Sequence, residues 1–348
     1  MPVPGRFEGG GRYPPFKENF LQWIVGVNWG RTGANFVSGD FCCFERYVSI
    51  EKAGAPQNWQ NYTTMCFSPG GGCFASTYGN TPKGPVFILG GHTGSGKIGI
   101  MQSFGGYKWT QVVVAGQALH DKTGDVKGLF WSEKDKLFYM QMSGSAPILK
   151  RAVYSPDGIY WFYAYSDFES YCDGYFKGIP DGVYGYDKAH DLVIYPGSNG
   201  QINPQSDSNV VSAIINATSK KPQEVQVDTG LQNCNCVTYC GGIWMAGGSG
   251  NLQDKQGNIT FSGSMTTSSL DGFYWFLSTH GSLGEPDDAP EGFEIETIIG
   301  GPIQDFKNVK PAKLEFDLDA SYDKTVFTAA ALAERKQQMR IARKRQRS

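Results

Sequence analysis

The sequence predicts an all-β protein built from repeated four-stranded antiparallel units, and three observations lead to this prediction. Glycine is abundant, at 46 of 348 residues, and aromatic residues make up 14% of the chain while charged residues make up 18%. This composition is typical of short strands joined by tight turns. A turn motif containing Asp–Gly also recurs along the chain, spaced by about the length of one four-stranded sheet.

The two clearest copies of this motif read YSPDGIYWFYA (154–164) and SSLDGFYWFLS (268–278). An Asp side chain accepts hydrogen bonds from the backbone of a β-turn, and Gly tolerates the positive φ that such a turn requires. We therefore expect the following residues to build two equivalent turns: Asp157, Gly158, Trp161, Asp271, Gly272 and Trp275.

Weaker copies of the motif complete a regular spacing. They lie at 51–62 and 103–114, and the tryptophans of the four copies stand at positions 59, 109, 161 and 275. The first two separations are 50 and 52 residues, and the third, 114, is twice 57. A further turn, without Trp, is therefore expected near Lys220–Lys221–Pro222.

Each unit also begins with a hairpin pattern, seen at 126–142, 183–197 and 237–250. Four antiparallel strands in about 50 residues is the size of one β-propeller blade. We therefore expect a five- or six-bladed β-propeller of four-stranded antiparallel blades over residues 20–322. The strand-like runs in 281–322 either close the ring with the N-terminal strand LQWIVGVNW or form a sixth blade.

The repeated turns resemble the Asp-box repeats of sialidase-type β-propellers, here in a shortened Ser-x-Asp-Gly-x-x-Trp form. The resemblance extends over residues 20–280 and implies the fold. In that family the turns lie away from the catalytic centre, and many members only bind. The resemblance therefore assigns Asp157 and Asp271 to turns and does not make them catalytic acids.

A sialidase-like site would require three converging arginines, a Tyr–Glu nucleophile pair and an acidic proton donor. Outside the basic C-terminal stretch the arginines are few and do not recur at first-strand positions: Arg6, Arg12, Arg31, Arg46 and Arg151. His120 and His190 each precede Asp in polar turn contexts, although a Ser-His-Asp triad assembled from separate strands stays open. We expect no catalytic residues and no enzymatic activity.

The stretch Gly91–Lys97 spells the G-x-x-x-x-G-K pattern of a phosphate-binding loop. Such a loop needs Ser or Thr after the Lys to hold Mg²⁺, and a helix to supply its dipole. Here Ile98 follows the Lys, and the alternating residues after it predict a strand. We expect a glycine-rich hairpin and no bound cofactor.

The cysteine cluster at Cys234, Cys236 and Cys240 has a C-x-C-x-x-x-C spacing that is unusual for zinc, and no His lies nearby. On a regular strand the three side chains would share one face. We expect them to be reduced, packed in the core on that face, and without a metal.

The last residues change character. We divide the chain into an extended N-terminal arm (1–19), the propeller (20–322) and a basic C-terminal α-helix (323–348), because Ala, Leu, Gln, Lys and Arg replace Gly and aromatic residues. From Lys324 onward eight Lys and Arg residues face Glu334 alone, a net charge of +7; the whole chain carries −2, so residues 1–323 carry −9.

This basic helix either ends the chain as a solvated segment, docks on an acidic surface of a neighbouring subunit, or lies near nucleic acid. The residues that we expect to bind the partner are Arg335, Lys336, Arg340, Arg343, Lys344, Arg345 and Arg347.

The N-terminus lacks the apolar core of a signal peptide, and no stretch approaches a membrane span, so we expect synthesis in a cytoplasm and no membrane partner. A propeller with segments at both ends is similar in architecture to propeller-containing structural proteins of tailed-phage virions. We expect a non-enzymatic virion protein, nozzle-like in the tail or attached to the capsid. It would be present in several copies, bound to other virion proteins and assembled in the host cytoplasm.

Two other functions stay open. One is a glycan-binding or sialidase-like propeller that recognises a host, in which exposed aromatic rings such as Tyr160 and Tyr274 would stack on sugars. The other is an intracellular interaction scaffold.

Overall fold

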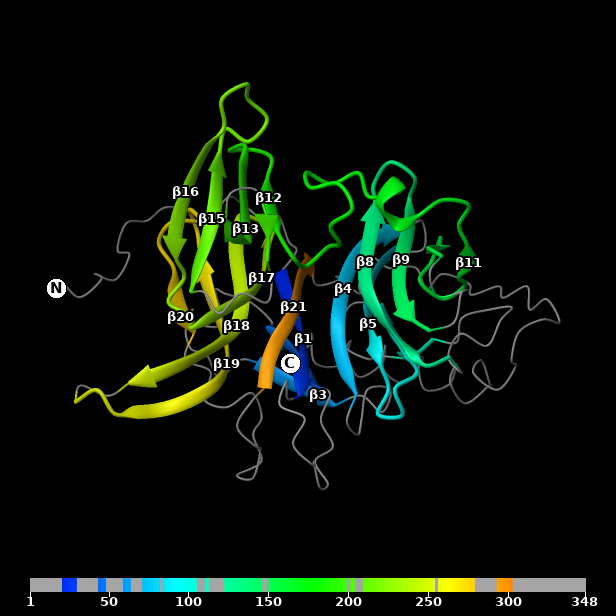
Figure 1. The fold of residues 1–348 in the computed structure, drawn as a ribbon, viewed down its shortest axis with the longest axis horizontal. Helices are drawn as coiled ribbons and strands as arrows, with labels where there is room; N and C mark the ends of the chain where they lie inside the picture. Colours follow the sequence, from blue (N-terminus) through cyan, green and yellow to red (C-terminus); the bar gives the residue numbers. More distant parts are fainter. Residues whose placement is uncertain are drawn as a thin grey trace, which may run out of the picture.

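The computed structural model of the chain describes residues 21–29, 43–47, 59–63, 71–81, 84–104, 110–112, 122–145, 149, 151–198, 201–203, 209–253, 256–278 and 293–302. Within these residues the protein is all-β, and its strands pair antiparallel in sheets arranged as in a β-propeller (Figure 1). No α-helix occurs in this part of the chain; a short 3-10 helix, η4, spans Phe168–Ser170.

The first sheet is the largest and has eight strands. Its main path runs in the order β3 (Trp59–Thr63), β2 (Cys43–Tyr47), β1 (Leu21–Trp29), β4 (Gly72–Thr81), β5 (Gly84–His92), β6 (Ile98–Phe104) and β7 (Thr110–Gln111). The last strand of the described chain, β21 (Phe293–Pro302), also pairs with β1.

The other three sheets follow the chain in order. The second is formed by β8 (Gly124–Ser132), β9 (Leu137–Gly144), β10 (Val153–Ser155) and β11 (Phe162–Tyr163). The third is formed by β12 (Gly185–Asp187), β13 (Leu192–Ser198), β14 (Gln201–Ile202), β15 (Val210–Ile215) and β16 (Gln223–Asp228). The fourth is formed by β17 (Asn233–Cys240), β18 (Ile243–Gln253), β19 (Ile259–Ser269) and β20 (Phe276–Ser278).

The described strands thus form four sheets, and the expectation of five or six separate blades is wrong in this respect. The reason is a single residue pair, Asn28 opposite Gly72, which joins β1 to β4. This pairing merges two four-stranded runs, β21-β1-β2-β3 and β4-β5-β6-β7, into one hydrogen-bonded sheet. A repeat count made along the sequence cannot detect such a contact.

The strand β21 closes the arrangement. It pairs with β1 from Leu21 opposite Pro302 to Trp29 opposite Phe293, with a register shift after Gly26. It also contacts β17 and β4, the first strands of their own four-stranded runs. The first and last strands of the described chain, β1 and β21, therefore lie side by side, as Figure 1 shows. Their pairing closes the arrangement of sheets.

The apolar core lies between neighbouring sheets. One cluster packs Ile88 of β5 against Val126 and Phe138 of the second sheet. A second cluster packs Ile194 of β13 against Trp244 of β18. These side chains are fully or almost fully buried, and each contributes about 1.5–3 kcal/mol of transfer free energy. The sheets are thus held together by side chains that alternate inward along each strand.

The glycine-rich stretch at 91–97 forms the expected hairpin. β5 ends at His92 and β6 begins at Ile98, and the turn between them is closed by Thr93 N donating to Lys97 O at 2.7 Å. A strand follows Lys97, so the helix dipole that a phosphate-binding loop requires is absent at this position.

The cysteines of β17 do not share one face, and that expectation is wrong. A β-bulge between Cys234 and Cys236 shifts the register, and the Asn235 side-chain amide donates to Ile295 O of β21 at 3.0 Å. Cys234 consequently packs in the cluster between the third and fourth sheets, while Cys236 lies beside Ile295. The cysteines whose side chains the structure describes are free thiols: Cys73, Cys172, Cys234, Cys236 and Cys240. The expected reduced state of the chain stays a prediction.

Several predictions concern residues outside the described ranges. These are the N-terminal arm 1–19, the C-terminal helix 323–348, and the whole set of partner-binding residues from Arg335 to Arg347. No helix among the described residues is long and apolar enough to cross a bilayer.

Candidate functional site

The two Asp–Gly turns have the same hydrogen-bond pattern. In the first, Asp157 Oδ1 accepts from the backbone N–H groups of Ile159 and Tyr160, both at 3.0 Å. The Ser155 hydroxyl accepts from Gly158 N at 2.8 Å, and the indole N–H of Trp161 donates back to Gly158 O at 3.2 Å. The Asp carboxylate thus replaces a backbone acceptor inside the turn.

The second turn repeats this pattern. Asp271 Oδ1 accepts from Phe273 N at 2.8 Å and from Tyr274 N at 2.9 Å, and the indole of Trp275 donates to Gly272 O at 3.0 Å. It connects β19 to β20 just as the first turn connects β10 to β11. Both aspartates are therefore placed as turn residues.

Each turn also packs on the preceding sheet. A Cβ on Gly158, whose φ is +74°, would lie 2.8 Å from Ile88 Cδ1 of β5. A Cβ on Gly272, whose φ is +82°, would lie 2.5 Å from Ile194 Cδ1 of β13. Each of these two positions requires glycine for two reasons: its φ is positive, and the isoleucine side chain of the neighbouring sheet leaves no room for a Cβ. The turns therefore join successive sheets.

The third sheet has a turn without this motif between β15 and β16. It spans residues 216–222, around the expected Lys220–Lys221–Pro222. Thr218 N and its hydroxyl both donate to the Asp191 carboxylate, at 3.0 and 2.9 Å. An aspartate from the neighbouring hairpin thus replaces the one that the local sequence lacks.

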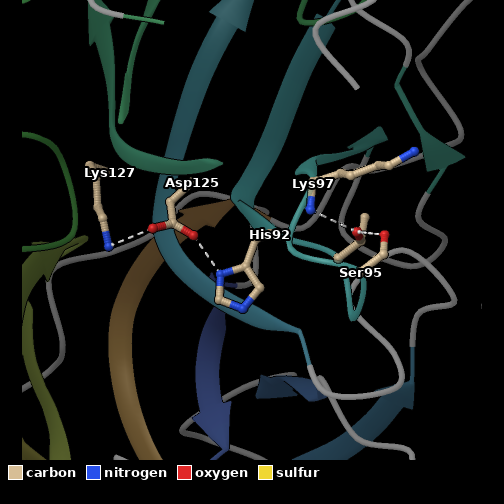
Figure 2. A network of polar contacts seen from close by, with 6 residues as sticks. His92, Ser95, Lys97, Asp125 and Lys127 are labelled. Carbon is tan, nitrogen blue, oxygen red and sulfur yellow. Dashed lines mark hydrogen bonds and ion pairs between the residues drawn. The ribbon is translucent and has the colours of Figure 1, made fainter. Parts of the chain in front are cut away.

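A His–Asp pair lies at the end of the β5–β6 hairpin. His92 Nδ1 lies 2.5 Å from Asp125 Oδ1, and Lys127 Nζ lies 3.1 Å from Asp125 Oδ2 (Figure 2). The hydrogen bond to His92, together with the nearby Lys127 ammonium, holds the pKa of Asp125 below its ordinary value even though partial burial opposes this. The side chains of His92 and Asp125 are each about a quarter exposed, at 25% and 26%.

An aromatic ring completes this cluster. The Phe74 ring centroid lies 5.2 Å from that of His92, and Lys127 Nζ lies 4.6 Å from the Phe74 ring centroid. A carboxylate bonded to Nδ1 orients an imidazole and leaves Nε2 for another partner, which is the arrangement used for general bases and ligand contacts.

The nearby Ser95 does not complete a triad with this pair. Its hydroxyl lies 2.9 Å from the Thr93 hydroxyl, and Figure 2 shows Ser95 and Lys97 on the opposite side of the hairpin from the imidazole. The cluster therefore has an oriented base, but Ser95 is not its nucleophile.

A second candidate site is centred on Asp181, in the connection between β11 and β12. Asp181 Oδ2 accepts from the Thr77 hydroxyl of β4 at 2.5 Å and from Trp131 N of β8 at 2.9 Å. Its own N–H donates to Leu129 O at 2.8 Å, and two residues later Val183 O accepts from Val237 N of β17 at 3.1 Å. The connection thus bonds to strands of three different sheets: β4, β8 and β17.

Close packing surrounds this carboxylate. A Cβ on Gly182 would lie 2.6 Å from Thr297 Oγ1 and 2.8 Å from Ser76 Oγ, and these two hydroxyls lie 2.6 Å apart. Burial raises the pKa of Asp181 to about 7, and the Asp173 carboxylate adds to this rise, while the bonds from Thr77 and Trp131 oppose it. Asp181 therefore exchanges a proton near neutral pH, as a functional acid or base would.

Sequence reasoning did not single out Asp181. Its neighbours, Pro180 and Gly182, read as an ordinary turn, and nothing local indicates that the turn lies against three sheets. His92 and Asp125 were also missed, because 33 residues separate them.

The histidines, tyrosines and arginines considered in the sequence analysis do not come together in one site in the described part of the chain. His190 Nδ1 lies 2.6 Å from Asp187 Oδ2, but this is a local contact three residues apart with an exposed imidazole. Tyr274 is 72% exposed, whereas Tyr160 is partly buried within its turn. Arg151 is exposed, and His120, Arg6, Arg12 and Arg31 lie outside the described ranges. In the described part of the chain no three His, Cys, Asp or Glu side chains are grouped to hold a metal.

Comparisons with known proteins give distant likenesses. No family model matches the sequence, and no curated protein matches it. Among solved structures the chain is similar to a glycosyl hydrolase from Bacteroides ovatus, at 12% identity over 66% of this chain and 79% of that one, with a TM-score of 0.33.

A second similar structure carries the name 6-phosphogluconolactonase, from Bacteroides fragilis, at 10% identity over 76% of this chain and 82% of that one, with a TM-score of 0.31. A third is a hydrazine synthase from Kuenenia stuttgartiensis, at 11% identity over 72% and 63%, with a TM-score of 0.25. All three carry the names of enzymes, but their TM-scores all lie below 0.5, so these likenesses assign no activity to this chain.

Proposed function

We propose that this protein is a non-enzymatic structural component of a tailed-phage virion, in the tail or attached to the capsid, and that it docks through its two terminal segments. The observation that supports this most is the pairing of Leu21 with Pro302. Leu21 and Pro302 face each other at one end of the β1–β21 pair, so the first 20 residues and the last 46 residues of the chain are attached at neighbouring points.

Two segments that start side by side can bind the same partner together. Once one is bound, the other is held at a high effective concentration, so avidity exceeds the affinity of either segment. The charge distribution points in the same direction, because residues 324–348 carry +7 and the rest of the chain −9. The partner surface would be acidic, on a neighbouring subunit or on nucleic acid.

The use of the acidic side chains agrees with a structural role. Asp157, Asp187, Asp191 and Asp271 each accept hydrogen bonds from backbone N–H groups of turns. These carboxylates organise the sheets and their connections. Because these four carboxylates are all occupied by hydrogen bonds from turn N–H groups, they favour a structural role over a role as catalytic acids.

A truncated chain ending at Pro302 tests the docking role. We expect it to keep the far-UV circular dichroism of the strands and to lose binding to the virion proteins of its own genome. A matched full-length variant replaces the basic side chains by Gln: Arg335, Lys336, Arg340, Arg343, Lys344, Arg345 and Arg347. Loss of binding in both would identify the basic charges, and full incorporation of the truncated chain would refute docking through this segment.

The second candidate function is glycan recognition or cleavage, and Asp181 is the observation that favours it. Glycoside cleavage needs a carboxylic acid that keeps its proton near neutral pH. The raised pKa of Asp181 and the nearby Asp173 meet that need in part. A glycan array and fluorogenic sialosides, with Asp181→Asn as the matched control, distinguish the two functions. Absence of binding and turnover would remove this candidate.

A further inference from the structure

Each four-stranded run begins with a strand that borders the centre of the fold, here called its first strand: β21, β4, β8, β12 and β17. β8 contacts β4, β4 contacts β21, β21 contacts β17, and β17 contacts β12. In the described part of the chain β12 and β8 share no comparable contact. β12 has 3 residues, whereas the other four first strands have 8 to 10. Strands alone therefore do not close this ring.

The connection between β11 and β12 fills the gap, and in Figure 1 it crosses from the second sheet to β12 over the middle of the view. Its residues 173–183 are here called the strap. Asp181 N donates to Leu129 O of β8 at 2.8 Å, and Val183 O accepts from Val237 N of β17 at 3.1 Å. The strap thus joins strands of the second and fourth sheets.

Gly182, between these two bonded residues, touches the remaining two first strands. Its φ is +75°, and a Cβ at this position would lie 2.8 Å from Ser76 Oγ of β4 and 2.9 Å from Ile298 O of β21. Three consecutive residues of the strap therefore contact four first strands.

The four contacts fall at equivalent positions of the four strands. Each strand has a bulge of one extra residue against the strand that it pairs with, and the strap contacts the residue two positions later. Residues at the same position in strands around a ring surround one point, so residues 181–183 lie at the centre of the fold. The bulged residues are Phe74, Lys127, Asn235 and Glu296, and the contacted residues are Ser76, Leu129, Val237 and Ile298.

The strap is attached less firmly than a strand. Among the described residues its backbone bonds to strands only through Asp181 and Val183, and it has no regular secondary structure. Side chains supply the other contacts, such as the Phe176 ring, whose centroid lies 5.1 Å from that of Tyr195. Segments with few backbone hydrogen bonds open at a lower free energy than strands within a ladder.

The carboxyl group of Asp181 has hydroxyl and N–H partners but no cation. β4 and β8 present the Thr77 hydroxyl and Trp131 N to it, and the residues of β17 and β21 at the contact, Val237 and Ile298, do not ionise. The ionisable groups that interact with it lie in its own connection: Cys172, Asp173 and Tyr184. None of them carries a positive charge, so ionisation of Asp181 places an unbalanced negative charge at the centre of the fold.

We propose that the strap is a releasable closure, which detaches from the first strands as one unit while the four sheets stay folded, and that ionisation of Asp181 favours the detached state. Water around the detached carboxyl restores its ordinary pKa of 3.8, whereas burial raises the pKa to about 7 in the docked strap. The detached fraction therefore rises between about pH 4 and pH 7 and is constant above that range. The closure does not involve the terminal segments, so it is independent of the proposed docking.

Amide hydrogen exchange of the full chain measures the detachment. The N–H groups of Trp131, Asp181 and Val237 bond across the contact and are the reporters, and the β13–β15 ladder is the internal reference. At pH 8 we expect the reporters to exchange about tenfold faster than the ladder or more, with little dependence on low urea concentrations because detachment exposes little surface. After correction for the chemical exchange rate, we expect their opening equilibrium to rise about 100-fold from pH 5 to pH 8.

Two variants test the roles of individual residues. Asp181→Asn cannot ionise, so we expect the reporters to lose their pH dependence, while the matched control Asp167→Asn, at an exposed position outside the strap, keeps it. Gly182→Ala places a Cβ against Ser76 and Ile298, so we expect its reporters to lose protection at both pH values while the ladder stays protected. Gly257→Ala is its matched control, because Gly257 also has a positive φ, of +88°, but has no atom within 4 Å of an added Cβ.

Reporters that exchange with the same protection and urea dependence as the ladder would show that the strap leaves only on global unfolding, and would overturn the proposal. An equal pH dependence in the wild type and in Asp181→Asn would overturn the role of the carboxyl group. If Gly182→Ala does not fold, the reporters of the wild type and of Asp181→Asn still decide both points.

Discussion

The Thr77 hydroxyl of β4 donates a 2.5 Å hydrogen bond to Oδ2 of Asp181, a residue that lies 104 positions later in the chain. The same oxygen accepts from Trp131 N of β8, so a single carboxylate holds the β11–β12 connection against two sheets. Because burial raises the pKa of this carboxyl to about 7, the strength of the joint depends on pH near neutrality.

The first prediction concerns the pH dependence of stability. The pKa of Asp181 rises from 3.8 to about 7 on folding, so the folded chain binds a proton that the unfolded chain releases. The free energy of unfolding therefore falls as the pH rises from about 4 to about 7. We expect Asp181→Asn to be more stable than the wild type at pH 8 by about 1–4 kcal/mol and nearly equal to it at pH 4.5.

Urea denaturation at the two pH values measures this difference. Asp167→Asn is the matched control, because Asp167 is exposed and its side chain makes no capping hydrogen bond. An equal effect of pH on both variants would mean that Asp181 ionises normally in the folded protein.

The second prediction concerns the two Asp–Gly turns. Asp157 is buried and Asp271 is exposed, although they make the same pair of backbone hydrogen bonds. Leaving buried N–H groups without an acceptor costs more than leaving exposed ones, so we expect about 1–3 kcal/mol for Asp157→Ala and about half of that for Asp271→Ala.

The corresponding Asn variants keep an oxygen acceptor and provide the control. Thermal unfolding of all four variants gives the ranking. Equal losses for Asp157→Ala and Asp271→Ala, or an Asn variant as unstable as its Ala counterpart, would contradict the assigned hydrogen bonds.

The third prediction concerns closure by β21. A chain that ends at Pro302 keeps the full β1–β21 pairing, whereas a chain that ends before Phe293 loses it together with the contacts to β4 and β17. We expect the first to unfold cooperatively near the wild-type temperature. We expect the second to lose several kcal/mol, since the buried Ile295 and Ile298 side chains are removed. Calorimetry checks both, and equal stability of the two chains would argue against closure.

The fourth prediction concerns the protonation of His92. Because Nδ1 faces the Asp125 carboxylate at 2.5 Å, the neutral imidazole carries its proton on Nδ1 and leaves Nε2 as an acceptor. We expect nitrogen-15 NMR to report the Nδ1–H form in the wild type and the common Nε2–H form in Asp125→Ala. His190, whose Nδ1 lies 2.6 Å from Asp187 Oδ2, is not altered by Asp125→Ala, so its signals should be the same in both proteins and serve as the internal control. An Nε2–H form in the wild type would contradict the pair.

Local chemistry explains what could be predicted from the sequence. The Asp–Gly turns, the hairpins at 126–142, 183–197 and 237–250, and the glycine-rich hairpin after His92 depend on residues that are neighbours in the chain. Turn geometry and strand alternation operate over a few residues, so their pattern is readable. The resemblance to Asp-box repeats and the virion role stay predictions.

Contacts between distant residues explain what could not. The pair Asn28–Gly72 merges two runs of strands, and the bulge at Asn235 turns Cys234 to another face. His92 meets Asp125 only after two sheets pack together, and the pKa of Asp181 is raised only because folding buries its carboxyl group between segments that are distant in the chain.

The sequence by itself thus determined that this chain forms antiparallel strands joined by Asp–Gly turns, because the hydrogen bonds of a turn form within a few residues. Only the tertiary structure decided how many sheets result and which carboxyl group becomes a weak acid. Sheet joining and burial depend on how segments far apart in the chain approach each other, and no single stretch of sequence encodes that approach.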